Sequence, residues 1–102
     1  MQSEDIKVAI CDDEEFYRSQ LDDMVSVYGN EMDVNMSIDL YNNAKELMNN
    51  ILSKSKEYDL LFLDVEMPGM TGIEMADALR RIDSWVCISF VTSYDAFAIQ
   101  AF

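Results

Sequence analysis

Three aspartates follow two apolar segments, where their charges can act together. Asp12 and Asp13 come directly after IKVAIC (residues 6–11), and Asp64 closes the apolar segment DLLFLD (59–64). If these segments are neighbouring parallel strands, the three carboxylates meet at one edge of the sheet. Two like charges about 4 Å apart cost about 4 kcal/mol at an effective dielectric near 20, so the cluster needs a raised pKa or a bound cation. Because carboxylates are hard oxygen ligands, the pattern predicts magnesium.

The same acids have a simpler interpretation. Asp12 or Asp13 could cap a following helix, near whose positive end Glu14 and Glu15 are favourable. Asp64 alone could be a turn residue before the proline. The joint placement of the acids at the ends of two strands favours the site.

A hydroxyl pair follows a third apolar segment. Thr92 ends VCISFVT (86–92) and Ser93 follows it, which places both at the same edge of the sheet if that segment is a parallel strand. Thr92 could donate a hydrogen bond to an anion held over Asp64. Ser93 is as well explained as a helix cap.

The elements that must position these residues alternate along the chain. Strands and helices follow one another with short turns, which predicts right-handed crossovers and a parallel sheet with helices on both faces, an α/β fold. The strands are expected at 6–11, 34–40, 59–64 and 86–92, and the helices at 14–28, 42–52 and 73–82, with a fourth beginning at 95.

Several finer features follow from periodicity. The first helix is expected to bury one face made of Tyr17, Leu21, Met24, Val25 and Tyr28. It is expected to end near Gly29 and Asn30, because a helix C-terminus often takes a left-handed residue. The second strand, an edge strand, is expected to bury Val34, Met36, Ile38 and Leu40. Asn42 or Asn43 is expected to cap the second helix. Both cysteines, Cys11 and Cys87, are expected to be buried free thiols.

Composition excludes several classes of protein. A length of 102 residues suits one domain, and a net charge of −13 opposes binding to phosphate backbones through the chain's own charge. The chain has no histidine, which removes the commonest general base and zinc ligand. Neither an apolar run long enough to span a membrane nor a signal peptide is visible, so a cytoplasmic location is expected.

At this point a family resemblance is visible. The segments AICDDEE, LLFLDVEMPGMTGIE and FVTSYDA resemble, in order, the three signature segments of a response-regulator receiver domain of two-component signalling. This resemblance implies that residues 1–102 form one receiver domain. It implies a flavodoxin-like, doubly wound parallel sheet of strand order 2-1-3-4. The family's fifth strand, its lysine and its fifth helix do not occur before Phe102.

The resemblance also implies roles for particular residues. Asp64 would be the phosphorylated aspartate. Mg²⁺ would be bound by Asp13 directly, by Asp12 largely through water, by Asp64, and by the backbone carbonyl of Glu66. Thr92 would be the switch hydroxyl. The domain would be a phosphoacceptor rather than an enzyme, with at most self-phosphorylation from small donors and autodephosphorylation.

Partners follow from the resemblance as well. A sensor histidine kinase would phosphorylate the domain, and CDDEEFYRSQL and TSYDAFAIQAF resemble receivers joined to a LytTR-type DNA-binding output module. Independently of the resemblance, the open edge of the fourth strand predicts self-association, such as a homodimer, through that strand or through the apolar start of the fourth helix (Phe97, Ile99 and Phe102). Two alternatives stay open: a degenerate receiver that acts as an interaction module without phosphate, and a small magnesium-dependent aspartyl-phosphate phosphohydrolase.

Overall fold

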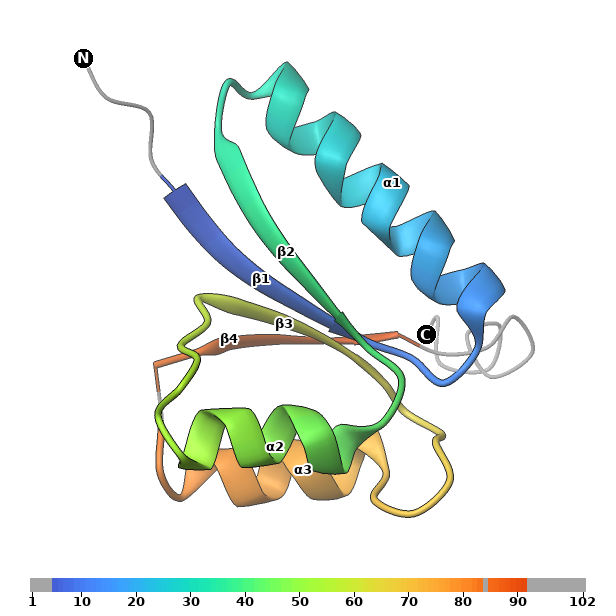
Figure 1. Cartoon of the computed structure of the whole chain (residues 1–102), viewed down its shortest axis with the longest axis vertical. Coiled ribbons are helices and arrows are strands. Elements are labelled where there is room, and N and C mark those ends of the chain that lie inside the picture. Colours follow the sequence, from blue (N-terminus) through green and yellow to red (C-terminus); the bar gives the residue numbers. More distant parts are fainter. Residues whose placement is uncertain (1–4, 84, 92–102) are drawn as a thin grey trace, which may run out of the picture.

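Four parallel strands form the centre of the molecule, with helices on both faces (Figure 1). The computed structural model describes residues 5–83 and 85–91. The elements are β1 (Asp5–Cys11), α1 (Glu15–Glu31), β2 (Asn35–Tyr41), α2 (Ala44–Leu52), β3 (Leu60–Asp64), α3 (Gly72–Arg80) and β4 (Cys87–Val91). The order β2-β1-β3-β4 confirms the predicted α/β class and strand order. Thr92, Ser93 and the helix expected from 95 lie outside the described residues.

The sheet separates two hydrophobic clusters of unequal size. The larger cluster lies between the sheet and the helices α2 and α3, and it includes Leu47, Leu61, Leu63, Met75 and Leu79, all fully buried. The smaller cluster lies beneath α1 and consists of Val8, Ile10 and Val25 with half-buried neighbours. Because the second half of β1 is covered on both faces, its residues 8–11 (VAIC) are a continuous apolar run rather than an alternating one.

The predicted buried face of α1 is wrong in part. Val25 is buried and Leu21 half-buried, but Tyr17, Met24 and Tyr28 are 38%, 65% and 56% exposed. The helix makes its main contacts with β1 and β2 alone, so only a narrow stripe of its surface meets the sheet. Apolar residues beside that stripe fit a helical period without being covered.

The predicted end of α1 also needs correction. The helix continues through Gly29 and Asn30 to Glu31, and the left-handed residue after it is Asp33, with φ 56°. Gly29 serves close packing instead. A Cβ at this position would lie 2.6 Å from Cγ of Met36, so a side chain would require either Met36 or the helix to shift.

Two expectations for the outer strands are wrong as well. In β2, Met36 and Ile38 are half-buried beneath α1, but Leu40 is 46% exposed. In β4, Cys87 is exposed, whereas Cys11 is buried as predicted. Cys87 pairs with Leu60, whose side chain packs on the α1 side of the sheet, and the main contacts of α1 do not extend to β4.

The helix starts are fixed by local hydrogen bonds. The predicted cap of α2 is Asn43, whose side chain accepts a hydrogen bond from the backbone N–H of Glu46 at 2.8 Å. α3 starts with a capping box between Thr71 and Glu74, in which each side chain accepts a hydrogen bond from the other residue's backbone N–H. None of the described helices combines the length and the apolar character needed to cross a membrane.

Candidate functional site

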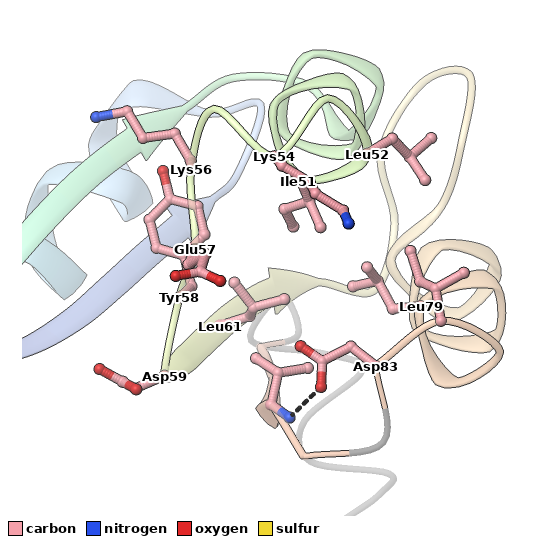
Figure 2. Close-up of a pocket in the computed structure, with 12 residues that line it drawn as sticks. Ile51, Leu52, Lys54, Lys56, Glu57, Tyr58, Asp59, Leu61, Leu79 and Asp83 are labelled. Atoms are coloured by element: carbon pink, nitrogen blue, oxygen red, sulfur yellow. Dashed lines mark hydrogen bonds between the residues drawn. The ribbon is translucent and has the colours of Figure 1, made fainter.

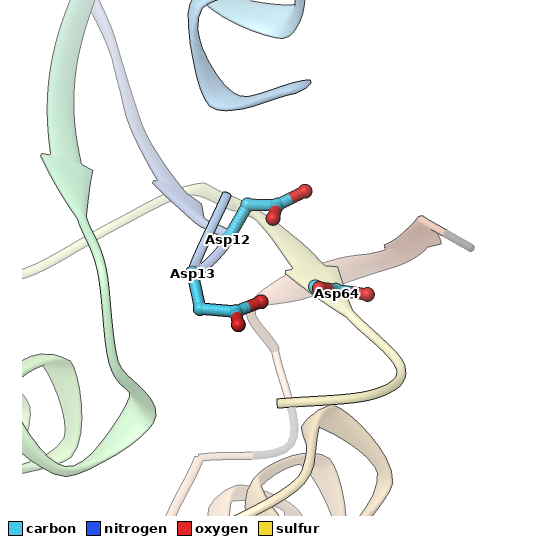
Figure 3. A group of neighbouring side chains, drawn as sticks. All are labelled: Asp12, Asp13 and Asp64. Carbon is cyan, nitrogen blue, oxygen red and sulfur yellow. The ribbon is translucent and has the colours of Figure 1, made fainter. Parts of the chain in front are cut away.

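The pairing of β1 with β3 brings the three predicted aspartates together. Cys11 pairs with Leu63 in parallel register, so Asp12 and Asp64 follow paired residues and leave the sheet side by side. Figure 3 shows Asp12 and Asp13 on the loop after β1, close to Asp64 at the end of β3. One carboxylate oxygen from each residue lies within 4.8 Å of the others. We call Asp12, Asp13 and Asp64 the acid trio.

The first loop of the site is held mainly through Asp12, which is only 3% exposed. Its carboxylate accepts the backbone N–H of Glu14 at 2.9 Å, and its own N–H donates to the carbonyl of Tyr41 at 3.0 Å. Its carbonyl accepts a hydrogen bond from Nη1 of Arg18 at 2.7 Å. Asp13, by contrast, is exposed.

The alternative interpretation, in which Asp12 or Asp13 caps the following helix, is partly correct for Asp12. Glu14 occupies the N-cap position of α1 without a side-chain capping bond, and Asp12 binds the Glu14 N–H from two positions before the cap. Asp12 thus orders the start of the helix and still contributes to the acid trio.

The second loop of the site lies against the start of α3. Asp64 accepts the backbone N–H of Glu66 at 3.2 Å, and the N–H of Gly72 donates to the carbonyl of Val65 at 3.2 Å. A Cβ at Gly72 would overlap the carbonyl oxygen of Asp64, so only glycine allows α3 to start this close to the aspartate. Gly69 turns the loop with φ 79°.

A buried sulfur contact joins the end of β1 to the loop after β3. The thiol of Cys11 donates to the thioether of Met67 at 3.7 Å, and both side chains are almost fully buried. Burial, with the charges of Asp12 and Asp64, raises the pKa of the Cys11 thiol to about 12, so the thiol stays protonated as a donor. The contact fixes the turn after Asp64 to the end of β1.

The electrostatics of the acid trio are unfavourable without a cation. Burial, followed by the charge of Asp12, raises the pKa of Asp64 to about 7. Burial also raises the pKa of Asp12. Within residues 5–83 and 85–91, the Lys or Arg ion pairs are Lys56–Asp39 and Arg81–Asp77, and neither includes the trio. Three crowded carboxylates without an ion pair form a donor set that fits a hard divalent cation such as Mg²⁺.

A hollow of about 290 Å³ opens above the acid trio. It is lined by Asp12, Asp13, Glu14, Tyr17, Asp64, Glu66 and Val91. This size admits a metal ion with a small anion. Glu66 is exposed at its rim, and Val91 is the last described residue of β4, directly before the predicted switch residue.

A larger hollow lies at the opposite edge of the sheet, between the ends of α2 and α3 (Figure 2). Its volume is about 560 Å³, and its floor is apolar, with Leu61, Leu79 and Val86 buried. Two of its three carboxylates, those of Asp59 and Asp83, already serve the fold. Asp59 accepts the N–H of Lys7, and Asp83 accepts the N–H of Val86. Size alone therefore does not mark the chemical site, and the smaller hollow holds the unpaired acids.

Sequence reasoning missed five supporting residues. Arg18, Met67, Gly72 and the Thr71–Glu74 capping box were not assigned positions around the site. The box carried a readable signal, since Thr followed three residues later by Glu is the capping-box pattern. The contacts of Arg18 and Met67 depend on packing between segments and left no local signal.

Comparison with known proteins places this geometry in a family. The family model described as "Response regulator receiver domain" matches residues 8–102. The sensory transduction protein LytT of Bacillus subtilis is 31% identical over 97 residues, 95% of this chain and 38% of LytT. The uncharacterized response regulatory protein VV1_0503 of Vibrio vulnificus is 38% identical over 95 residues, 91% of this chain and 36% of that protein. The chain thus spans less than two fifths of the length of these relatives.

Solved structures agree with the sequence relatives. The response regulator TrrA of Thermotoga maritima, in complex with Mg²⁺-BeF, superimposes with a TM-score of 0.75 at 28% identity, covering 93% of this chain and 76% of TrrA. In a complex of TrrA with the histidine kinase ThkA, the matched chain superimposes with a TM-score of 0.72 at 30% identity, covering 87% of this chain and 70% of that chain. From its family match, its strand order and its sequence relatives, the chain belongs to the response regulator receiver domain family.

Proposed function

We propose that this receiver domain accepts a phosphoryl group on Asp64 in a magnesium-dependent reaction. The observation that carries the proposal is the acid trio, whose oxygens lie within 4.8 Å of one another. Asp12, Asp13, Asp64 and the backbone carbonyl of Glu66 would hold Mg²⁺, and Thr92 would be the switch hydroxyl. The complex of the similar protein TrrA with Mg²⁺-BeF supports magnesium binding by this domain.

The protein's own part in the reaction is positioning. Bound Mg²⁺ would supply charge neutralisation, which lets an anionic carboxylate meet an anionic phosphoryl group. Asp64 is held for attack by its bond to the Glu66 N–H and by the close approach of α3 at Gly72. Asp12 is fixed by three hydrogen bonds, whereas Asp13 is exposed. Phosphoryl transfer asks for little more than such positioning and electrostatic stabilisation.

The partners of this domain are proposed from its relatives. A sensor histidine kinase is the proposed phosphodonor, supported by the complex of TrrA with the kinase ThkA. A DNA-binding output module of LytTR type is proposed for the full-length protein, supported by relatives named as LytT and as the transcriptional regulatory protein NatR. Residues 1–102 are proposed to act as one receiver unit in a cytoplasmic protein. Association of two copies through the edge of β4 stays a prediction.

The test is phosphorylation of the full-length protein with acetyl phosphate, with and without Mg²⁺. Intact-mass spectrometry should find one added phosphoryl group with Mg²⁺ and none with a chelator. Asp64→Asn should abolish the added mass. Asp77→Asn, which changes an exposed aspartate of α3, is the matched control and should keep it. If Mg²⁺ binds but Asp64 is never modified, the domain is an interaction module, and the proposed function is wrong.

A further inference from the structure

Arg18 occupies an unusual place for a cation. It lies in the first turn of α1, where the positive end of the helix dipole disfavours a positive charge. It shares the sheet-facing side of α1 with Val25 and Gly29, seven and eleven residues further along the helix, and its side chain is half-buried. An arginine held there needs a compensating interaction.

That interaction is with the backbone of the acid trio. Nη1 of Arg18 donates to the carbonyl oxygen of Asp12 at 2.7 Å, a short hydrogen bond from a charged donor. The N–H of Asp12 is bound to Tyr41, and its carboxylate to the N–H of Glu14. Arg18 makes no ion pair with the trio, so it acts on the loop through the peptide that joins Asp12 to Asp13.

We propose that Arg18 is a positioning residue that holds the Asp12–Asp13 peptide in the geometry required by Mg²⁺. The proposal rests on the proposed function of the trio as a magnesium site. Residues that orient metal ligands from outside the coordination shell commonly change metal affinity by about 10- to 100-fold when they are mutated. Arg18 is placed to do this because it reaches the backbone between two of the carboxylates.

Comparing Mg²⁺ with Ca²⁺ separates the effect of Arg18 on loop geometry from the effect of its positive charge. Mg²⁺ demands near-octahedral coordination at short distances, whereas Ca²⁺ accepts longer and irregular coordination. A looser loop should therefore weaken Mg²⁺ binding more than Ca²⁺ binding. The lost positive charge of Arg18 would act on both divalent ions alike, because they carry equal charge. The ratio of Mg²⁺ to Ca²⁺ affinity thus reports on positioning alone.

The experiment is calorimetric titration of the full-length protein with MgCl₂ and with CaCl₂. In Arg18→Met, which keeps an unbranched stem but loses the donor and the charge, the Mg²⁺ to Ca²⁺ affinity ratio should fall about tenfold. Arg81→Met is the matched control, because Arg81 lies after α3 in an exposed ion pair with Asp77, and it should leave the ratio unchanged. Circular dichroism and thermal melting establish that each variant is folded.

The outcomes are distinct. An unchanged ratio in folded Arg18→Met overturns the proposal, even if both affinities change. If Arg18→Met does not fold, Arg18→Gln provides the same test, since its shorter side chain cannot reach as arginine does, and the same fall is expected. A wild-type protein that binds neither ion while remaining folded overturns the proposed magnesium site itself, and with it this inference.

Discussion

Two groups of polar side chains in this domain satisfy their charges in opposite ways. The acid trio gathers carboxylates at the carboxyl edge of the sheet, and the described residues supply it with no ion pair. A second group, which we call the tyrosine network (Asp39, Tyr41, Asn50, Lys56 and Tyr58), joins β2 to α2 and to the loop before β3. In the network, each polar group meets a partner from the protein itself.

The hydrogen bonds of the tyrosine network run in one direction. Tyr58 donates to Asp39 at 2.6 Å, so its oxygen is the acceptor for Tyr41, 2.6 Å away. The oxygen of Tyr41 in turn accepts the side-chain N–H of Asn50 at 2.9 Å. Burial and the bond to Asp39 raise the pKa of Tyr58, which keeps the phenol as a donor. Such a chain polarises itself and fixes the loop before β3 to the edge strand.

The comparison shows how to tell a structural cluster from a site. The network contains one carboxylate, balanced by a phenol and a lysine, and it is complete without a ligand. The acid trio contains three carboxylates, and burial and mutual repulsion leave Asp64 with a pKa near 7. A cluster whose charges are not balanced within the protein is the one prepared for an external cation.

The largest expected effect is on metal binding at Asp13. Asp13→Asn should weaken Mg²⁺ affinity by more than about tenfold, because it removes the proposed direct ligand rather than an outer partner. The same change should raise the melting temperature of the metal-free protein, since it relieves repulsion within the trio. Titration calorimetry and thermal melts in EDTA measure the two effects. Asp23→Asn, an exposed acid of α1, is the control. A metal-free variant less stable than wild type would mean that Asp13 supports the fold.

A substitution in the tyrosine network should lower stability and leave metal binding unchanged, the opposite of the result expected for Asp13→Asn. Tyr58→Phe should destabilise the protein by about 1–3 kcal/mol, because Asp39 loses its donor and Tyr41 its acceptor in a half-buried position. Chemical denaturation measures the change, and Mg²⁺ affinity should stay at the wild-type value. Loss of metal binding in a folded variant would contradict the separation of the two groups.

The unbalanced charge of the acid trio should also make the stability of the metal-free protein depend on pH. Asp64 has a raised pKa of about 7 in the folded chain, whereas an unfolded aspartate titrates near 3.9. The folded state therefore holds a proton that the unfolded state has lost between these values. The metal-free protein should lose stability as the pH rises from about 4 through about 7, and Mg²⁺ affinity should rise over the upper part of the same range. Thermal melts in EDTA across this range test the first effect. Asp64→Asn should flatten the dependence, and an unchanged slope would assign it to other groups.

The smallest expected effect concerns the ion pair of the network. Lys56 lies 3.4 Å from Asp39, but the two side chains are 49% and 41% exposed. Exposed pairs contribute about 0.2–1 kcal/mol, so Lys56→Met should destabilise the protein by no more than that. Denaturation at low and high salt measures it. A loss equal to that of Tyr58→Phe would show that the charge, rather than the hydrogen-bond chain, holds the network together.

Much of the site could be predicted because its geometry follows from strand polarity. Asp12 and Asp64 each end a run of apolar residues, and the carboxyl ends of neighbouring parallel strands share one edge, so the approach of the two acids needed no knowledge of side-chain packing. The residues that support these acids were harder to predict from the sequence. Cys11 and Met67 are 56 positions apart, and Arg18 meets Asp12 only because of how α1 is set against the sheet.

The sequence by itself determined the alternation of strands and helices, the parallel sheet and the acids at its carboxyl edge, because these depend on local periodicity and on the direction of the chain. The tertiary structure alone decided which apolar residues are covered. Tyr17 and Met24 fit the helical period of α1, and Cys87 lies in an apolar run, yet all three are exposed because α1 lies mainly over β1 and β2. It also decided that Asp39 pairs with Lys56, whereas Asp64 has no ion pair within the described residues. Hydrogen bonds and burial between distant segments depend on the final packing, and no local pattern encodes them.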